Sequence, residues 1–396
     1  LDRLSKDNST LGISSLRAYG LDKKVFDKLA EVKNTSLTFA PEAGTQRMRE
    51  VINKNVSEED MMQTAEDIFS RGWQKMKLYF MIGLPTETDE DVIGIMETGR
   101  KALKVAHKLQ AKNPSITVSV SSFVPKPHTP FQWASMITQS EIERKQEMLY
   151  KLSRDYRLNF RKHKSQISHL EGIVSRGDRR VASIIYAAWS RGARFDGWDE
   201  TFKYNLWLEC VAESGINTEC MLGTIPVKAR LPWNHIDVGL TEKFLEREWL
   251  KAVNSRLSPP CGKVAGMIVH HSNLETLSKT FDIDKKKLVC YHCGIKCDLK
   301  YMVEERKEFL EEVDAQKDEP YVRPELIDKS HFPREQRLNT EVGFVYRMEV
   351  SKMGSISFIS HLDLQKIVAR IFKRAEIVYL YSQGFNPNPL LPSAQH

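Results

Sequence analysis

Several common features are missing from this sequence of 396 residues, and each absence excludes a class of protein. No run approaches the roughly 18 consecutive apolar residues of a membrane-spanning helix, so no membrane partner is expected. The six cysteines are too few for a disulfide-rich secreted scaffold. The chain begins with Leu1 and no signal peptide follows, so we expect an internal fragment of a longer, cytoplasmic protein.

Basic residues outnumber acidic residues only slightly. With 59 basic and 52 acidic residues, the net charge is +7, which permits a nucleic-acid partner without arguing strongly for one. Hydrophobic residues make up 41% and charged residues 28%, which is ordinary for a globular chain. Internal repeats and low-complexity tracts are absent, so a repeat architecture is not expected.

The first third of the chain alternates between strand and helix patterns. Strands are predicted at 13–17, 36–40, 76–83 and 116–124, with apolar residues at helical spacing between them. The third of these runs is almost continuously apolar, as expected for a strand buried on both faces. Strands alternating with helices predict a parallel sheet whose ligands bind at the carboxyl ends of the strands.

The rest of the chain changes composition several times. One long, charged helix is predicted from Gln139 to about Lys164. We expect five segments: a strand–helix segment that forms an open sheet or half of a barrel (1–138), a helical extension (139–250), a cysteine-rich region (251–302), a linker (303–343) and a new folded segment (344–396).

Three loops at predicted strand ends carry the candidate binding residues. Glu42 and Gly44 follow one strand, where a carboxylate can accept hydrogen bonds from a ligand or can simply favour a helix entry. Gly83 and Pro85 follow the next strand, where a flat ring can approach glycine, although a plain connector has the same composition. Val124-Pro125 opens a stiff, proline-rich rim that can present backbone groups to a nucleobase.

The proline-rich rim also contains His128. Its side chain titrates near neutral pH and is therefore an acid–base candidate. A purely structural histidine is the more common finding in such a loop.

These loops resemble motifs of the radical S-adenosylmethionine (SAM) superfamily. The stretches LTFAPEAGTQRMREVINKNVSEED, KLYFMIGLPTETDED and SSFVPKPHTPFQW are similar to one subgroup in particular. That subgroup has an N-terminal cobalamin-binding domain and a C-terminal radical-SAM-linked domain. The resemblance continues through RGDRR, GARFDGW and LPWNHID to SHLD and GFNP, and so covers most of the chain.

The resemblance implies an α/β fold and a function. The fold is a partial (half) TIM-type barrel of parallel strands, then a mainly helical region, a cysteine knuckle and the start of an α+β domain. The activity is reductive cleavage of SAM by a [4Fe–4S] cluster, with flavodoxin or ferredoxin as electron donor and cobalamin in the parent protein. The implied cofactor-binding residues are Glu42, Gly44, Lys54, Gly83, Pro85, Glu87, Val124 and Pro125.

The cysteines that hold the family's cluster are missing. The family uses a Cys-x3-Cys-x2-Cys motif, and no cysteine precedes Cys210 in this sequence. Truncation is the simplest explanation. We therefore expect this chain alone to be inactive, whereas the parent is an enzyme of unknown substrate, with RNA as one candidate.

A different cysteine cluster lies further along the chain. Cys290, Cys293 and Cys297 have the spacing of a metal knuckle, and Cys261 is a candidate fourth ligand, with His292 as another. Zinc and an auxiliary iron–sulfur cluster fit this spacing equally well, and reduced, unligated thiols are the alternative.

The last segment contains a basic helical face, formed by Lys366, Arg370, Lys373 and Arg374. Such a face can contact an RNA backbone or can simply be solvated. The alternative to the enzyme is therefore a non-catalytic RNA-binding module that uses this helix and the cysteine knuckle.

Overall fold

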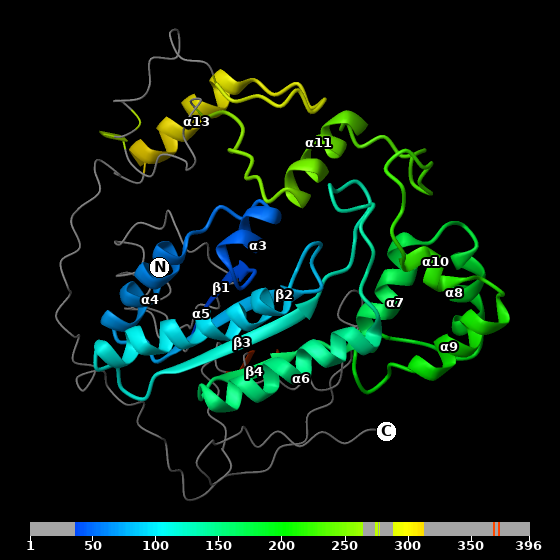
Figure 1. Cartoon of the computed structure of the whole chain (residues 1–396), viewed down its shortest axis with the longest axis horizontal. Helices are drawn as coiled ribbons and strands as arrows, with labels where there is room; N and C mark the ends of the chain where they lie inside the picture. Colours follow the sequence, from blue (N-terminus) through cyan, green and yellow to red (C-terminus); the bar gives the residue numbers. More distant parts are fainter. Residues whose placement is uncertain are drawn as a thin grey trace, which may run out of the picture. The chain divides into compact units, whose positions relative to one another are not determined.

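The structure, a computed structural model, describes residues 36–263, 274–275, 277, 288–312, 367–368 and 371–372. Within this part, four parallel strands form one sheet in the order β1-β2-β3-β4 (Figure 1), which confirms the predicted α/β class and partial barrel. The strands are β1 (Leu37–Glu42), β2 (Lys75–Ile82), β3 (Ser115–Ser122) and β4 (Asn159–Lys162).

Helices connect the strands and continue beyond the sheet. Those next to the sheet are α3 (Gln46–Val51), α4 (Glu58–Ser70), α5 (Asp89–Lys108) and α6 (Gln139–Asp155). The others are α7 (Ser165–Arg176), α8 (Val181–Ser190), α9 (Tyr204–Glu213), α10 (Thr218–Leu222), α11 (Glu242–Val253) and α13 (Leu299–Glu312).

Side chains at the helix starts explain where α4 and α5 begin. Ser57 caps α4 and forms a capping box with Asp60. Thr88 caps α5 in the same way, with Asp91 as its partner. Each box satisfies backbone N–H groups that a helix start leaves unpaired.

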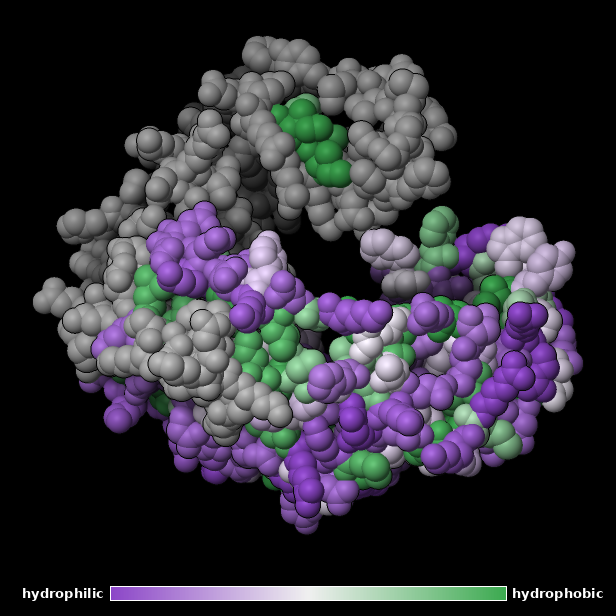
Figure 2. Space-filling model, turned by 90° about the horizontal axis from the view of Figure 1, so that it is seen from above, coloured by the Kyte–Doolittle hydropathy of each residue, from purple (hydrophilic) through white to green (hydrophobic). Residues whose placement is uncertain are grey.

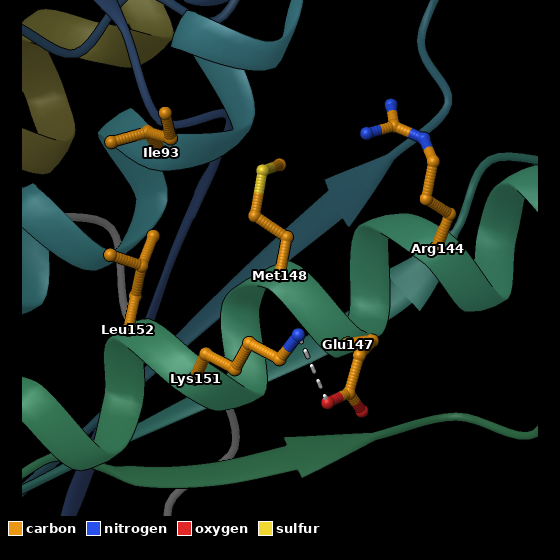
Figure 3. Close-up of a pocket in the computed structure, with 6 residues that line it drawn as sticks. All are labelled: Ile93, Arg144, Glu147, Met148, Lys151 and Leu152. Carbon is orange, nitrogen blue, oxygen red and sulfur yellow. Dashed lines mark ion pairs between the residues drawn. The ribbon is translucent and has the colours of Figure 1, made fainter.

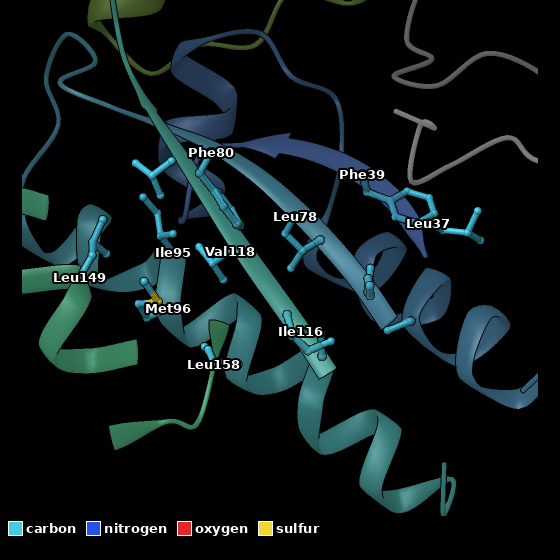
Figure 4. Packing of buried hydrophobic residues seen from close by; sticks show 14 of the residues in the cluster. Leu37, Phe39, Leu78, Phe80, Ile95, Met96, Ile116, Val118, Leu149 and Leu158 are labelled. Carbon is cyan, nitrogen blue, oxygen red and sulfur yellow. The ribbon is translucent and has the colours of Figure 1, made fainter. Parts of the chain in front are cut away.

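The main core lies between the sheet and helices α4, α5 and α6. Alternate strand residues such as Leu78, Phe80 and Val118 are buried there against Ile95 and Leu149 of the helices (Figure 4). Side chains in a strand alternate between its two faces, so the residues between these buried ones lie on the other face.

That second face is not buried, so the prediction that residues 76–83 form a strand buried on both faces is wrong. Along β2, buried residues alternate with exposed or half-buried ones, and Tyr79 is 36% exposed. Lys77 and Tyr79 alternate with buried apolar residues, as in a strand with one buried face. Met81 is apolar as well, so the sequence there looks like a continuous apolar run.

The predicted helix from Gln139 to Lys164 is also wrong beyond Asp155. Arg157 has a φ of 57°, and its N–H donates to the carbonyl of Arg154 (3.2 Å) while that of Leu158 donates to Ser153 (2.8 Å). This is a Schellman ending, formed without the usual glycine. The chain then enters β4, which pairs in parallel with β3.

The chain divides into two compact units, Leu1–Ile327 and Asp328–His396, and the elements above belong to the first. The strand predicted at 13–17 and most of the predicted basic helix lie outside the described residues. Among the helices that the structure describes, none has both the length and the apolar character needed to span a membrane.

Candidate functional site

The loops after β1, β2 and β3 meet at one edge of the sheet. Their buried residues Ala43, Leu84 and Phe123, one from each loop, belong to a single hydrophobic cluster, which Phe131 and Trp249 also contact. Parallel strands place all their carboxyl ends at the same edge. The structure therefore brings the three predicted loops together.

Glu42 lies at the end of β1 in a strained conformation. Its φ is 69°, in the left-handed region, and the β1–β2 register shifts between Phe39 and Glu42. A non-glycine residue pays about 1 kcal/mol or more for this conformation, and such strain is concentrated at functional sites. Lys54 Nζ lies 3.4 Å from Glu42 Oε1, and both side chains are partly exposed, so the carboxylate keeps room to accept further hydrogen bonds.

Gly44 is required for packing. A Cβ added there would lie closer than 3.0 Å to the backbone of Asp91, Gly94 and Ile95 in α5. The buried Arg49 donates hydrogen bonds to the carbonyls of Ala43 (3.2 Å) and Gly44 (3.3 Å), and burial lowers the pKa of its guanidinium. Gly44 thus lets the loop after β1 lie directly on α5.

Asp91 connects the loop after β1 to the loop after β2 through hydrogen bonds. It accepts hydrogen bonds from Thr45 and Arg47 of the first loop and helix and from Thr88 of the second. Arg47 also donates to the Thr86 carbonyl at 2.9 Å. Burial favours a higher pKa for Asp91, but these hydrogen bonds outweigh it and keep the pKa below its ordinary value. Sequence reasoning missed Asp91, although Thr-x-x-Asp before an apolar helix marks a capping box.

Glu87 faces the protein interior. Its Oε1 accepts hydrogen bonds from the Gly83 N–H (2.8 Å) and from Lys145 Nζ of α6 (2.7 Å). The side chains of Glu87 and Lys145 are only 3% and 6% exposed. Burial raises the pKa of Glu87, although Lys145 and the Gly83 amide oppose the rise. The carboxylate therefore shapes the loop around Gly83 and the partly buried Pro85, and it does not point into the solvent.

The proline-rich rim after β3 combines buried backbone with unpaired polar atoms. Val124 and Pro125 are buried. His128 has a φ of 57°, and its Nε2 is a buried atom without a hydrogen-bond partner among the described residues, as is Ser122 Oγ at the end of β3. Because unpaired buried polar atoms are costly, both atoms are candidates for contact with a ligand. Ser122 carried no signal in the sequence beyond its place at a strand end.

The four predicted metal-binding cysteines come from two neighbouring segments. Hydrogen bonds between backbone groups join Gly262 to Val289 (2.9 Å) and Val289 to Lys263 (2.7 Å). Burial and then the nearby thiols of Cys293, Cys290 and Cys297 raise the pKa of Cys261. The cysteines therefore lie near one another. Within the described ranges, however, no three His, Cys, Asp or Glu side chains are arranged to hold a metal ion.

A shallow pocket lies away from the strand-end loops, between α5 and α6 (Figure 3). Ile93, Met148 and Leu152 form its apolar lining. At its margin, Lys151 Nζ lies 3.9 Å from Glu147 Oε1. It lies on the helical side of the sheet, so it is separate from the loops after the strands.

Comparison with known proteins identifies two regions. Residues 8–99 match the radical SAM superfamily, and residues 345–395 match DUF2344, described as an uncharacterized protein conserved in bacteria. The first match includes β1, β2 and the loops that follow them. This match does not show whether the chain belongs to the subgroup that has a cobalamin-binding domain.

A curated relative matches 43% of the chain. Uncharacterized protein MJ0966 of Methanocaldococcus jannaschii is 33% identical over 176 residues. These residues are 43% of this chain and 36% of the relative, so the match spans about a third of the relative's length. The chain therefore carries a radical SAM superfamily domain at residues 8–99 and a DUF2344 region at residues 345–395.

Proposed function

We propose that the loops after β1, β2 and β3 bind SAM in an enzyme that cleaves SAM reductively with a [4Fe–4S] cluster. The radical SAM domain supports a radical SAM-type function in general. The observation that carries the specific proposal is the meeting of the three loops at one sheet edge, where the accessible carboxylate of Glu42 lies. Ligands of parallel α/β folds bind at this edge.

Each predicted cofactor-binding residue has a role in this proposal. Glu42, oriented by Lys54, would accept hydrogen bonds from the ribose hydroxyls or the amino group of SAM. Gly83 and the rim at Val124-Pro125 would frame the adenine. Three further residues would act indirectly by shaping the loops, namely Gly44, Pro85 and Glu87.

This chain does not contain the cysteine motif that binds the cluster. A [4Fe–4S] cluster of this family needs three thiolates in a Cys-x3-Cys-x2-Cys motif, and no cysteine precedes Cys210. The cluster would require ligands from outside these 396 residues. We propose that flavodoxin or ferredoxin donates the electron to the cluster and that the parent protein also binds cobalamin.

The cysteine knuckle supports a second, structural metal site. We propose that Cys261, Cys290, Cys293 and Cys297 together bind one zinc ion or one auxiliary iron–sulfur cluster. The two backbone hydrogen bonds between residues 262–263 and 289 support it, because they hold both cysteine segments together. Four thiolates are the usual ligands for either group.

The SAM proposal is tested on the complete protein that contains this chain. The protein is prepared without oxygen and loaded with iron and sulfide, and 5′-deoxyadenosine is measured with and without Glu42→Gln. We expect a loss of about 10- to 100-fold, as for other lost positioning contacts. Glu90→Gln on the exposed start of α5 is the matched control and should leave the rate unchanged. A folded, cluster-loaded protein that never forms 5′-deoxyadenosine contradicts the proposal.

A further inference from the structure

Helix α11 packs on the edge of the sheet where the three loops meet. Ala252 on α11 is buried in the hydrophobic cluster that the loops share, and α11 contacts α3, which follows the first loop (Figure 1). The ring of Trp249 on α11 has its centre 6.0 Å from that of Phe131, which in turn lies 5.7 Å from that of Phe123, just after β3. Both pairs are edge to face, a favourable arrangement of aromatic rings. These contacts hold α11 against the candidate SAM site.

The residues after α11 hold the turn that precedes Lys54. The Ser258 N–H donates to Oδ1 of Asn53 at 2.9 Å, and Asn53 has a φ of 54°, in the left-handed region. The hydroxyl of the buried Ser258 donates to Glu248 of α11 at 2.7 Å, so this one serine connects the turn to the helix. Lys54 comes next in the chain and pairs with Glu42. A movement of α11 would therefore reach the carboxylate that we assign to SAM.

The cysteine segment also contacts α11, mainly through Tyr291. The Tyr291 carbonyl accepts a hydrogen bond from Arg247 of α11 at 2.7 Å, and Lys251 Nζ of the same helix lies 4.4 Å from the centre of the tyrosine ring. The Tyr291 hydroxyl donates to the carbonyl of Pro259 at 2.6 Å, next to Ser258. Tyr291 directly follows Cys290, a proposed metal ligand. One side chain thus connects the proposed metal site to α11 and to the residues after it.

We propose that the cysteine segment regulates the candidate SAM site through α11. With metal bound, the four cysteines hold Tyr291 against α11, and this contact keeps Asn53 and the Glu42–Lys54 pair in the orientation that binds SAM. No residue from 290 to 298 is buried, so the segment has little packing of its own. A bound metal supplies the ordering that such segments lack. The inference rests on both functions proposed above and deepens them by naming a regulation of the SAM site.

Hydrophobic packing of α11 does not by itself fix the link to Asn53. Residues 256–260 form neither helix nor strand, and the hydrogen bonds at Ser258 and Pro259 hold this stretch. Loss of the Tyr291 contact therefore frees the stretch that positions Asn53, even while Trp249 keeps α11 in place. The link is polar, like much of the described surface in Figure 2, and the main core includes none of its residues. Its loss should leave the sheet folded.

Hydrogen exchange on the full chain, with metal bound and after chelation, measures the link directly. No cysteine precedes Cys210, so the chain lacks the cysteines of the SAM cluster and chelation acts on the cysteine segment alone. After chelation we expect exchange at residues 43–56 to become at least about 5-fold faster, the lower end of typical coupling between sites. Exchange in β3 should not change. Unchanged exchange at residues 43–56 after complete loss of metal overturns the proposal.

Two variants break the link while keeping all four cysteines. Metal-loaded Tyr291→Ala should exchange at residues 43–56 as fast as the chelated wild type, with its metal content checked by elemental analysis. Arg247→Met removes the donor to the Tyr291 carbonyl from outside the cysteine segment and should act in the same direction. Tyr186→Ala is the matched control, because this tyrosine on α8 is 68% exposed and should not affect residues 43–56. Metal-loaded Arg247→Met and Tyr291→Ala proteins that both exchange like the wild type overturn the proposal.

Equilibrium dialysis with SAM on the complete, cluster-loaded protein separates this inference from the function on which it rests. We expect Tyr291→Ala to bind SAM at least about 5-fold more weakly than the wild type and Tyr186→Ala to bind it equally well. Equal SAM affinity of Tyr291→Ala and the wild type overturns the regulation and leaves the SAM assignment intact. A complete protein that neither binds SAM nor forms 5′-deoxyadenosine removes the SAM assignment and the regulation with it, whatever the exchange measurement shows of the link.

Discussion

At the scale of single residues, the pair formed by Glu87 and Lys145 decides the shape of the loop after β2. Both side chains are almost fully buried, and Glu87 also accepts the Gly83 N–H. Sequence reasoning assigned Glu87 to ligand binding because of its motif. The partner lies 58 positions away in α6, and a local pattern contains no information about such a distant contact.

Lys145→Met should destabilise the protein strongly. The change leaves a buried carboxylate without its cation, which costs about 3–5 kcal/mol in the free energy of unfolding. Burial raises the pKa of Glu87 in the folded state. The ionised carboxylate therefore lowers the free energy of unfolding at high pH, and protonation of Glu87 at lower pH restores it. The deficit of the variant should therefore be larger at pH 8 than at pH 5. Urea unfolding at both pH values measures it.

Two further variants test whether the pair is responsible. Lys145→Met/Glu87→Gln removes both charges and should recover part of the loss. Lys101→Met breaks a half-exposed pair with Glu58 and should cost less than about 1 kcal/mol. A Lys145→Met deficit that is small and independent of pH would contradict the buried pair.

Gly44→Ala tests the close packing of the first loop. The added methyl group would meet the backbone of α5 and not a movable side chain, so the free energy of unfolding should fall by at least about 1–3 kcal/mol. Gly197→Ala is the matched control, since no atom lies within 4 Å of its added Cβ. Thermal unfolding compares the two, and equal midpoints would show that the loop can move away from α5.

At the scale of secondary-structure elements, regular patterns were predictable and irregular endings were not. The strand patterns at 36–40 and 116–124 are local, so the sequence predicts β1 and β3. The end of α6 depends on Arg157, a residue type with no preference for the left-handed region, and on the burial of Leu158. These tertiary contacts explain why β4 was missed.

Arg176 joins α7 to the rim after β3 and to α10. Its buried guanidinium donates to the carbonyls of Gln132 (3.1 Å), Ala134 (2.7 Å), Met221 (2.7 Å) and Gly223 (2.6 Å). Arg176→Met would remove the donor from two buried acceptors, at Gln132 and Ala134, and from two half-buried ones, at Met221 and Gly223, at a cost of at least about 3 kcal/mol.

The effect of Arg176→Met should be seen in both joined segments. Hydrogen exchange should become faster around residues 132–134 and around residues 221–223. Arg180→Met, which breaks an exposed pair with Asp178, should leave exchange in both segments unchanged. Unchanged exchange in Arg176→Met would contradict the role of this side chain.

At the scale of the whole molecule, the arrangement of the loops follows from the topology of the sheet. A parallel sheet with strands in sequence order places successive loops side by side, so the meeting of the three loops was predictable from the alternating pattern. The row formed by Lys77, Thr117 and Asn159 across three strands was not predictable, because only the structure supplies the register of the strands.

The proposed metal site should affect one region and leave the sheet intact. The cysteine segments contact α11 and the residues before it, where the Thr241 N–H donates to the Cys293 carbonyl (2.7 Å) and Arg247 donates to the Tyr291 carbonyl (2.7 Å). The main core includes none of these residues. Removing the metal should therefore loosen residues 239–263 and 288–298 without lowering the unfolding temperature of the sheet.

Elemental analysis and hydrogen exchange test this prediction. We expect about one zinc per chain, or iron with matching sulfide, and faster exchange in those two segments after chelation. Cys293→Ser should lose the metal and reproduce the exchange pattern, whereas Cys220→Ser, an exposed thiol on α10, should change neither. Wild-type protein that contains no metal, or a Cys220→Ser variant that loses it equally, would show that the four thiols are not the ligands.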